Sequence, residues 1–293
     1  MNRQPTLAAI GCTGEISRIF VKGFLDLGIS LKLLARSRQS TAAQYPAAQI
    51  VPGSMMNVDD IASTMQDADA AFLITPIGPC NDTSIEAKSA RAAIEAAKRV
   101  GLPHLIYISV IGINQPTGVP LLDSKREVEA MLTASGIPWT SIRCGSYMED
   151  VIDTRLAALR RGIYLFPVTP TRQFNFTFQG DVPRFIHELL AQGQPLNGAL
   201  DFIDPRTYSV TEVARMMSKA TGRRIVPSGK LPLYLLELAQ PIFYWRKHRL
   251  ATIIPLIRYF NQHGYTGNIR ELAEAYPKFR MTSLEEHLQK LLA

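Results

Sequence analysis

The sequence has few cysteines, no long apolar run and no leading apolar segment, and each absence excludes a class of protein. Its 293 residues include three cysteines, Cys12, Cys80 and Cys144, too few and too far apart for a disulfide framework or a thiolate metal site. The stretch from Leu231 to Trp245 is broken by prolines and a glutamate, and it is too short to span a bilayer. All three cysteines stand beside apolar or Gly-rich strand ends, so we expect buried free thiols. Because Met1–Thr6 contains no apolar export segment, we expect a cytoplasmic location.

The basic residues are in excess but are not concentrated anywhere. Lysine and arginine number 32 against 25 aspartates and glutamates, which gives a net charge of +7. This excess suits an anionic small ligand. The basic residues are scattered, however, with no lysine-rich stripe or repeated aromatic platform, so we expect no nucleic-acid partner. With 46% apolar residues and 19% charged residues, the composition is that of a folded globular protein.

The common catalytic templates are also missing. None of the ten tyrosines has a lysine four residues later, and Leu121 stands four residues before Lys125, so no Tyr-x-x-x-Lys proton-transfer pair exists. There is no G-x-S-x-G, no C-x-x-C and no histidine pair at metal-ligand spacing. We expect the five isolated histidines to lie at the surface or at helix ends. The carboxylates Glu149 and Asp150 are most simply solvated helix charges, although Glu149 is also a candidate for closing a pocket.

What is present begins near the N-terminus. The apolar run Ala8–Ile10 leads into a turn with Gly11 and Gly14, and the apolar-periodic segment Ile16–Leu27 follows at once. A strand, a glycine turn and a helix in this order place backbone N–H groups and a helix N-terminus beneath a bound phosphate. The spacing matches the first two glycines of a T-G-x-x-G-x-x-G dinucleotide loop, and Ser17 stands in place of the third. A plain turn is the alternative interpretation.

The residues after the second expected strand indicate which dinucleotide would fit. The segment Ile29–Ala35 predicts a strand, and Arg36-Ser37-Arg38 follows it without an acidic residue. An acidic residue near this point bonds the ribose 2′-hydroxyl of NAD, whereas a guanidinium suits a phosphate. The sequence therefore favours NADP(H) over NAD(H), with a solvated basic turn as the alternative.

The first half of the chain alternates strand and helix patterns with short links. Four more apolar runs predict strands, namely Ala48–Pro52, Ala70–Thr75, His104–Val110 and Trp139–Arg143. The clearest helix is Ser84–Val100, ending at Gly101. Continuous apolar strands are typical of a parallel sheet covered by helices on both faces. We expect an α/β fold with a Rossmann-type doubly wound parallel sheet in residues 1–150.

Beyond residue 150 the pattern changes. The segment Gln173–Gln179 alternates apolar and polar residues and predicts a half-buried strand near the surface. Helices are expected over Asp181–Leu190 and Thr211–Thr221, and an aromatic-rich region runs from Leu231 to Phe260, either as a substrate contact or as the core of a lobe. We expect residues 151–293 to form a smaller, mostly helical, substrate-side lobe over the carboxyl ends of the strands.

Together these features resemble the NmrA-like branch of the atypical short-chain dehydrogenases. The resemblance covers roughly residues 5 to 225. It is carried by Gly11–Ser17, by Arg36, by Phe72–Pro76 and by two later segments, Lys125–Glu129 and Ser135–Asp150. The last of these is similar to the family motif R-P-x-x-F-x-E-N, with Cys144 in place of proline and Asp150 in place of asparagine.

The resemblance implies that NADP(H) lies extended along the strand ends. By residue-level correspondence, the pyrophosphate would contact Gly11, Thr13, Gly14, Glu15 and Ile16, and the 2′-phosphate would contact Arg36 and Ser37. The adenosine or ribose side would contact Thr75 and Pro76, and the nicotinamide would be surrounded by Ser109, Val110, Lys125, Gly145, Ser146 and Tyr147. For Thr75 and Ser109 a plain strand-end role is the alternative, and for Lys125 a solvated helix start.

Two functions fit this sequence. The preferred one is an NADPH-dependent oxidoreductase acting on a small apolar acceptor, such as a quinone, an activated alkene or an imine. Hydride transfer would proceed without the usual tyrosine, and Lys125 or Tyr147 would supply a proton if needed. The alternative is a non-catalytic NADP(H)-binding redox sensor, regulator or assembly factor with a protein partner. In that case the aromatic-basic segment Tyr244–Arg249 is a candidate contact with a partner or a membrane surface, and homo-oligomerisation stays open.

Overall fold

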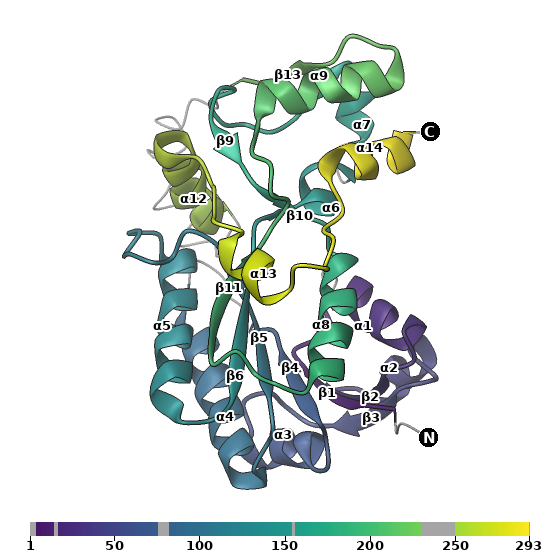
Figure 1. The fold of residues 1–293 in the computed structure, drawn as a ribbon, viewed down its shortest axis with the longest axis vertical. Coiled ribbons are helices and arrows are strands. Elements are labelled where there is room, and N and C mark those ends of the chain that lie inside the picture. The colour runs from purple at the N-terminus through teal and green to yellow at the C-terminus, as the bar shows by residue number, and fades with distance from the viewer. Residues whose placement is uncertain (1–3, 15–16, 76–81, 154–155, 230–249, 293) are drawn as a thin grey trace.

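The computed structural model describes residues 4–14, 17–75, 82–153, 156–229 and 250–292 (Figure 1). A parallel sheet flanked by helices forms the lower part of the molecule in this view, and a smaller group of helices and short strands lies above it. The expected segment Leu231–Phe260 falls largely outside the described residues, with Tyr259 and Phe260 inside them.

Seven strands form the central sheet, and all of their pairings are parallel. Their order across the sheet is β11-β6-β5-β4-β1-β2-β3. The strands are β1 (Thr6–Ile10), β2 (Ser30–Ala35), β3 (Gln49–Pro52), β4 (Ala70–Leu73), β5 (Leu105–Val110), β6 (Trp139–Cys144) and β11 (Gly198–Phe202). The winding direction reverses between β1 and β4, which is where ligands collect in open α/β sheets. The prediction of a doubly wound parallel sheet is confirmed.

Helices cover both faces of this sheet, which explains why its strands are continuous apolar runs. One face packs against α1 (Ser17–Asp26), α8 (Asp181–Gln192) and α13 (Arg270–Ala275), and the other against α3 (Val58–Met65), α4 (Ser84–Val100) and α5 (Pro120–Ser135). Helix α2 (Arg38–Gln44) follows β2. The predicted helix Ser84–Val100 is confirmed at both ends, and Gly101 terminates it with φ +62°.

The remaining elements form the upper lobe in Figure 1, around a second apolar core. Its helices are α6 (Met148–Val151), α7 (Leu156–Leu159), α9 (Val210–Thr221), α12 (Leu250–His263) and α14 (Leu284–Leu292). Its strands are β7 (Ser146–Tyr147), β8 (Ile163–Tyr164), β9 (Gln173–Phe174), β10 (Phe176–Thr177), β12 (Tyr208–Ser209) and β13 (Val226–Pro227). Since α8 and β11 belong to the sheet layer, the later half of the chain contributes to both parts. The division at about residue 150 stays a prediction.

The prediction of one half-buried surface strand over Gln173–Gln179 is wrong. Two short strands occur instead, β9 pairing with β12 and β10 with β7, and they are separated by Asn175. The Asn175 side chain donates to the carbonyl oxygens of Asp204 and Arg206 at 3.0 Å each, and it accepts from the N–H of Gly267 at 3.0 Å. The polar residues Asn175, Thr177 and Gln179 are buried, whereas Gln173 is exposed, so the segment does not alternate between a buried and a solvent face.

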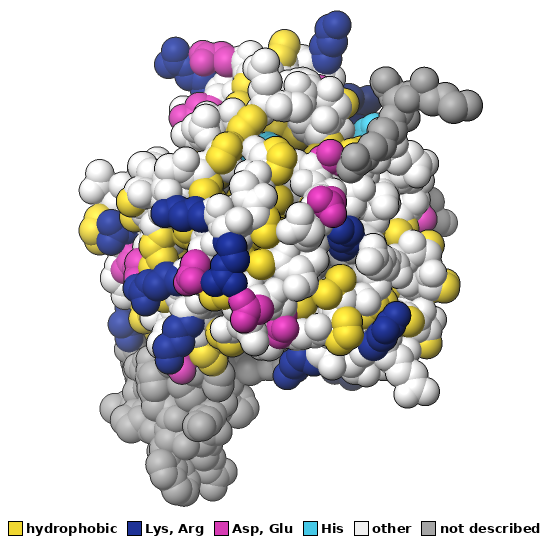
Figure 2. Space-filling model, turned by 90° about the horizontal axis from the view of Figure 1, so that it is seen from below, with side chains coloured by type: hydrophobic (Ala, Val, Ile, Leu, Met, Phe, Trp, Pro, Cys, Tyr) yellow, Lys and Arg dark blue, Asp and Glu magenta, His cyan; other side chains and the backbone are white. Residues whose placement is uncertain are grey.

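The face at the amino ends of the strands carries charges of both signs. Figure 2 shows lysines and arginines interspersed with aspartates and glutamates on this face, with neither sign gathered into a continuous area. Among the described residues, no helix combines the length and apolar character needed to cross a bilayer.

Candidate functional site

The glycine loop lies at the carboxyl end of β1, where the winding reverses. Gly11 has φ +78°, and a Cβ there would lie 1.9 Å from the carbonyl oxygen of Ile74, so the loop passes tightly over the end of β4. Thr13 and Gly14 are exposed, and a Cβ on Gly14 would meet no described atom nearer than 4.0 Å. Ser17 begins α1 and its hydroxyl donates to the Gly11 carbonyl at 3.4 Å, so the serine closes the turn. Glu15 and Ile16 lie outside the described residues.

The basic turn lies at the same edge of the sheet, because β2 pairs directly with β1. Arg36 follows β2 and is exposed. Ser37 caps α2, since its hydroxyl oxygen accepts from the Ser40 N–H at 3.5 Å and lies 2.8 Å from the Ser40 hydroxyl. The structure thus brings Arg36, Ser37 and the exposed part of the glycine loop to adjacent strand ends.

A buried polar cluster lies beside this loop on the face covered by α4 and α5. Its centre is Glu86, which is fully buried in the first turn of α4. Oε1 of Glu86 lies 2.7 Å from Nζ of Lys125 and accepts from the hydroxyls of Thr75 at 2.5 Å and Tyr107 at 3.1 Å. Oε2 accepts from the hydroxyl of Ser124 at 2.5 Å, and Lys125 also donates to Thr75 Oγ1 at 3.2 Å. Lys125 is therefore not a solvated helix-start residue.

Two further predicted positions lie close by on β5. The side chains of a strand alternate between faces, so Ser109 points to the same face as Tyr107, towards α4 and α5. Ser109 is 1% exposed, and its hydroxyl has no hydrogen-bond partner among the described residues. A buried hydroxyl without a partner fits a position completed by a ligand. Val110 ends the strand and is partly exposed. Pro76 lies outside the described residues.

Tyr147 occupies the opposite face. Its ring meets Phe20 of α1 edge-on at a centroid distance of 6.2 Å, and it packs against the core between the sheet, α1 and α8. Burial raises the pKa of Tyr147 well above the usual value, so the phenol keeps its proton at neutral pH. Gly145 and Ser146 lead into it at the end of β6, and a Cβ on Gly145 would lie 2.6 Å from a backbone oxygen of the upper lobe. The fold therefore separates Tyr147 from Lys125.

Three expectations about isolated polar residues are wrong. Glu149 is not a solvated helix charge, because it is partly buried and accepts from the N–H of Gln179 at 2.9 Å and 3.2 Å. Burial raises the pKa of Glu149 to about 7. His104 and His287 are buried rather than exposed, with His104 Nε2 2.8 Å from a threonine hydroxyl and His287 Nε2 2.9 Å from Asp153. Burial lowers the pKa of His104 to about 4.

Sequence reasoning missed Glu86, the residue on which the polar cluster converges. A signal was present, because Glu86 is in helical register with Ala90, Ala93 and Ala97, which form the buried side of α4. A carboxylate on the apolar face of a helix predicts a buried partner, since an unpaired buried charge is strongly unfavourable.

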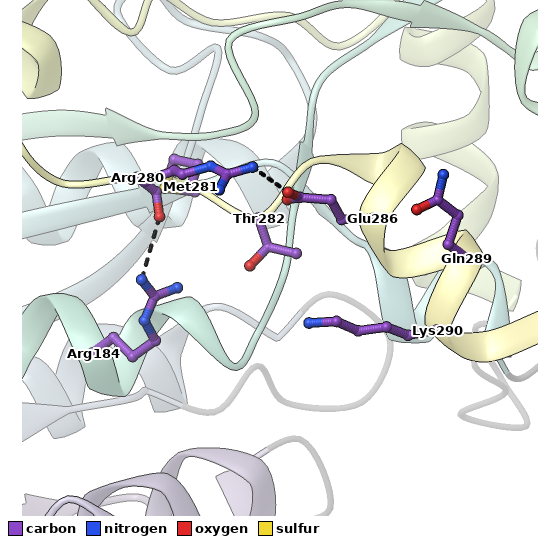
Figure 3. A pocket seen from close by; sticks show the side chains of 7 residues that line it. All are labelled: Arg184, Arg280, Met281, Thr282, Glu286, Gln289 and Lys290. Atoms are coloured by element: carbon purple, nitrogen blue, oxygen red, sulfur yellow. Dashed lines mark hydrogen bonds and ion pairs between the residues drawn. The ribbon is translucent and has the colours of Figure 1, made fainter.

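A cavity of about 480 Å³ lies between α8 and α14 (Figure 3). It is lined by Arg184, Arg280, Met281, Thr282, Glu286, Gln289 and Lys290. Arg280 pairs with Glu286 and its carbonyl accepts from Arg184, as the dashed lines show. None of the predicted site residues lines it, so the candidate site remains the edge formed by β1, β2, β4 and β5.

The strand order and the glycine loop at the reversal point define a Rossmann-type doubly wound protein. The chain belongs to the NmrA-like family, whose model matches residues 3–288. The family resemblance seen in the sequence is thus confirmed.

Named relatives include both an assembly factor and a reductase. The photosystem II assembly factor Ycf39 of Cyanophora paradoxa is 20% identical over 302 residues, covering 97% of this chain and 91% of its own length. Quinone oxidoreductase 2 of Escherichia coli (strain K12) is 25% identical over 226 residues, covering 75% of this chain and 76% of its own length. The crystal structure of NADPH-dependent quinone oxidoreductase QOR2 complexed with NADPH from Escherichia coli matches with a TM-score of 0.78 at 18% identity. That match covers 98% of this chain and 100% of the other, and it shows the shared fold.

Proposed function

We propose that the protein binds NADP(H) and reduces a small apolar acceptor of the quinone type. The observation that carries this proposal is the adjacency of the exposed part of the glycine loop to Arg36. Gly14 leaves open space where a phosphate needs close approach to the backbone, and no acidic side chain stands at the end of β2. The solved QOR2 complex with NADPH supports the same choice of cofactor for this fold.

The residues at the other end of the edge fit the nicotinamide half. Lys125 offers an ammonium donor, and Ser109 offers a buried hydroxyl without a partner among the described residues. When bound, NADPH supplies a hydride. The chain's own contribution is to orient the dinucleotide, to exclude water from the strand ends, and to hold a proton at Lys125 Nζ for the reduced acceptor. Lys125 is favoured over Tyr147 as the proton donor because it shares a face with Thr75 and Ser109.

A second function is favoured by a specific observation. Leu121 stands where a Tyr-x-x-x-Lys pair would have its tyrosine, and Tyr147 packs on the other face of the sheet. The ring of Tyr107 lies 5.2 Å from Lys125 Nζ, but this tyrosine is fully buried and donates to Glu86, so it does not replace the missing phenol. A protein that binds NADP(H) without turnover and contacts a protein partner would need no such phenol. The assembly factor Ycf39, which matches along nearly the whole chain, supports this alternative.

One experiment tests both functions. We would titrate the protein calorimetrically with NADPH and with NADH, and then follow NADPH absorbance after adding a panel of quinones. The reductase function predicts tighter binding of NADPH than of NADH, and NADPH oxidation that depends on the quinone. Binding without oxidation would favour the regulator or assembly factor. If neither dinucleotide binds, both functions are wrong.

A further inference from the structure

Glu86 contacts residues of the candidate cofactor site, but its own side chain does not line the site. Its side chain is completely buried, and the two carboxylate oxygens accept from three hydroxyl groups and one ammonium group. Four donors on two oxygens is the hydrogen-bonding pattern of an acceptor-only carboxylate. No part of Glu86 is exposed to meet a ligand directly.

Its contacts connect four elements at the same edge of the sheet, where β4 and β5 end and α4 and α5 begin. Glu86 belongs to the first turn of α4, Thr75 follows β4, Tyr107 lies in β5, and Ser124 and Lys125 lie near the start of α5. Of these, Thr75 and Lys125 stand among the positions proposed to contact the cofactor. The Thr75 hydroxyl donates its proton to Glu86 and accepts from Lys125, so Lys125 is the candidate cofactor contact that Glu86 positions.

Lys125 depends on this contact for its position. The ammonium group has three N–H donors, and the described residues give two of them acceptors, Glu86 Oε1 and Thr75 Oγ1. An ammonium that is only 8% exposed needs a charge partner to stay in place, and Glu86 supplies it. The third N–H donor has no acceptor among the described residues, so it is the one that a bound ligand would meet. A pair of this kind adds little net stability compared with apolar side chains of the same volume, so stability alone does not explain it.

We propose that Glu86 is a positioning residue of the cofactor site, which holds the Lys125 ammonium ready for the nicotinamide ribose. The inference rests on the proposed NADP(H) binding. It assigns the two halves of the cofactor to different residues, because Glu86 acts on the nicotinamide ribose contact and Arg36 contacts the adenosine 2′-phosphate.

Two probes distinguish these halves. NADPH contains both, whereas adenosine 2′,5′-bisphosphate has the 2′-phosphate but no nicotinamide ribose. We expect Glu86→Gln and Lys125→Met each to weaken NADPH about tenfold, with bisphosphate affinity changed less than about twofold. In the double variant we expect the NADPH affinity of Lys125→Met alone, because Glu86 acts through Lys125.

The matched control is Glu129→Gln. Glu129 is also a buried carboxylate, but on α5, where it pairs with Arg143 at 2.5 Å and accepts from the Ser141 hydroxyl at 2.7 Å. Its loss removes a comparable ion pair, and we expect the ratio of NADPH to bisphosphate affinity to stay unchanged. Thermal unfolding of every variant separates a loss of stability from a loss of binding.

The outcomes are distinct. If the wild-type protein binds neither probe, the proposed function fails and the inference falls with it. If the wild type binds both and Glu86→Gln weakens both equally, or has no effect, the inference alone is overturned. An additive loss in the double variant also overturns it. If Glu86→Gln does not fold, the double variant Glu86→Gln/Lys125→Met is compared with Lys125→Met alone. Unaltered NADPH binding by Lys125→Met then overturns the inference.

Discussion

Reversing the charge of Arg36 tests the cofactor preference most directly. A hydrogen bond between an ionised donor and a phosphate contributes about 1.5–3 kcal/mol, and Arg36→Glu removes it. Because Arg36 is exposed, the added repulsion is only about 1 kcal/mol for two unit charges 4 Å apart in water. The sum of about 3 kcal/mol, with Arg38 still present, corresponds to roughly hundredfold weaker NADPH binding. NADH lacks the 2′-phosphate, so its affinity should change less than about threefold.

Calorimetric titration of both dinucleotides into the variant and the wild type measures these changes. Lys219→Glu, an exposed residue of α9, makes the same change in net charge and should leave the ratio of the two affinities unaltered. Raising the salt concentration should shrink the effect of Arg36→Glu, because exposed charges are screened. Equal losses for NADPH and NADH would refute the assignment of Arg36 to the 2′-phosphate.

Four other substitutions have defined outcomes. Gly14→Ala should fold normally, since its Cβ has room, yet weaken the binding of NADPH at least about tenfold. Gly11→Ala should lose about 3 kcal/mol or more of stability, because its Cβ clashes with the Ile74 carbonyl. Unchanged NADPH binding by a folded Gly14→Ala would contradict the phosphate role. Burial raises the pKa of Glu149 from 4.5 to about 7 in the folded state. Below pH 4.5 the carboxyl is protonated in both states, and the free energy of unfolding falls as the pH rises from 4.5 to 7. Urea unfolding should therefore show Glu149→Gln gaining about 2 kcal/mol over the wild type above pH 7 and nothing near pH 4.5, and parallel pH curves would count against it. Tyr147→Phe should keep NADPH oxidation within about threefold for any acceptor that is reduced, and a fall of about a hundredfold would make Tyr147 the proton donor instead.

Local signals were sufficient for the sheet layer. Continuous apolar runs, glycines at helix ends and the regular alternation of strand and helix specify this layer, because each signal acts within a few residues. Ser84–Val100 is correct to the residue, and β11 was the one strand of the sheet not recognised. The prediction for Gln173–Gln179 failed because its burial is decided by segments distant in the sequence, both earlier and later in the chain. Period-two alternation reports a half-buried strand only where one face is open to water.

The candidate site divides in the same way. Consecutive residues were enough to predict the glycine loop and the basic turn, since backbone geometry and side-chain charge within a few residues carry those signals. Only the tertiary structure placed Tyr147 and Lys125 on opposite faces and joined Glu86 to Lys125 across α4 and α5. Those relations depend on which helices cover which side of the sheet. They also depend on a buried charge finding its partner at long range, which no local pattern encodes.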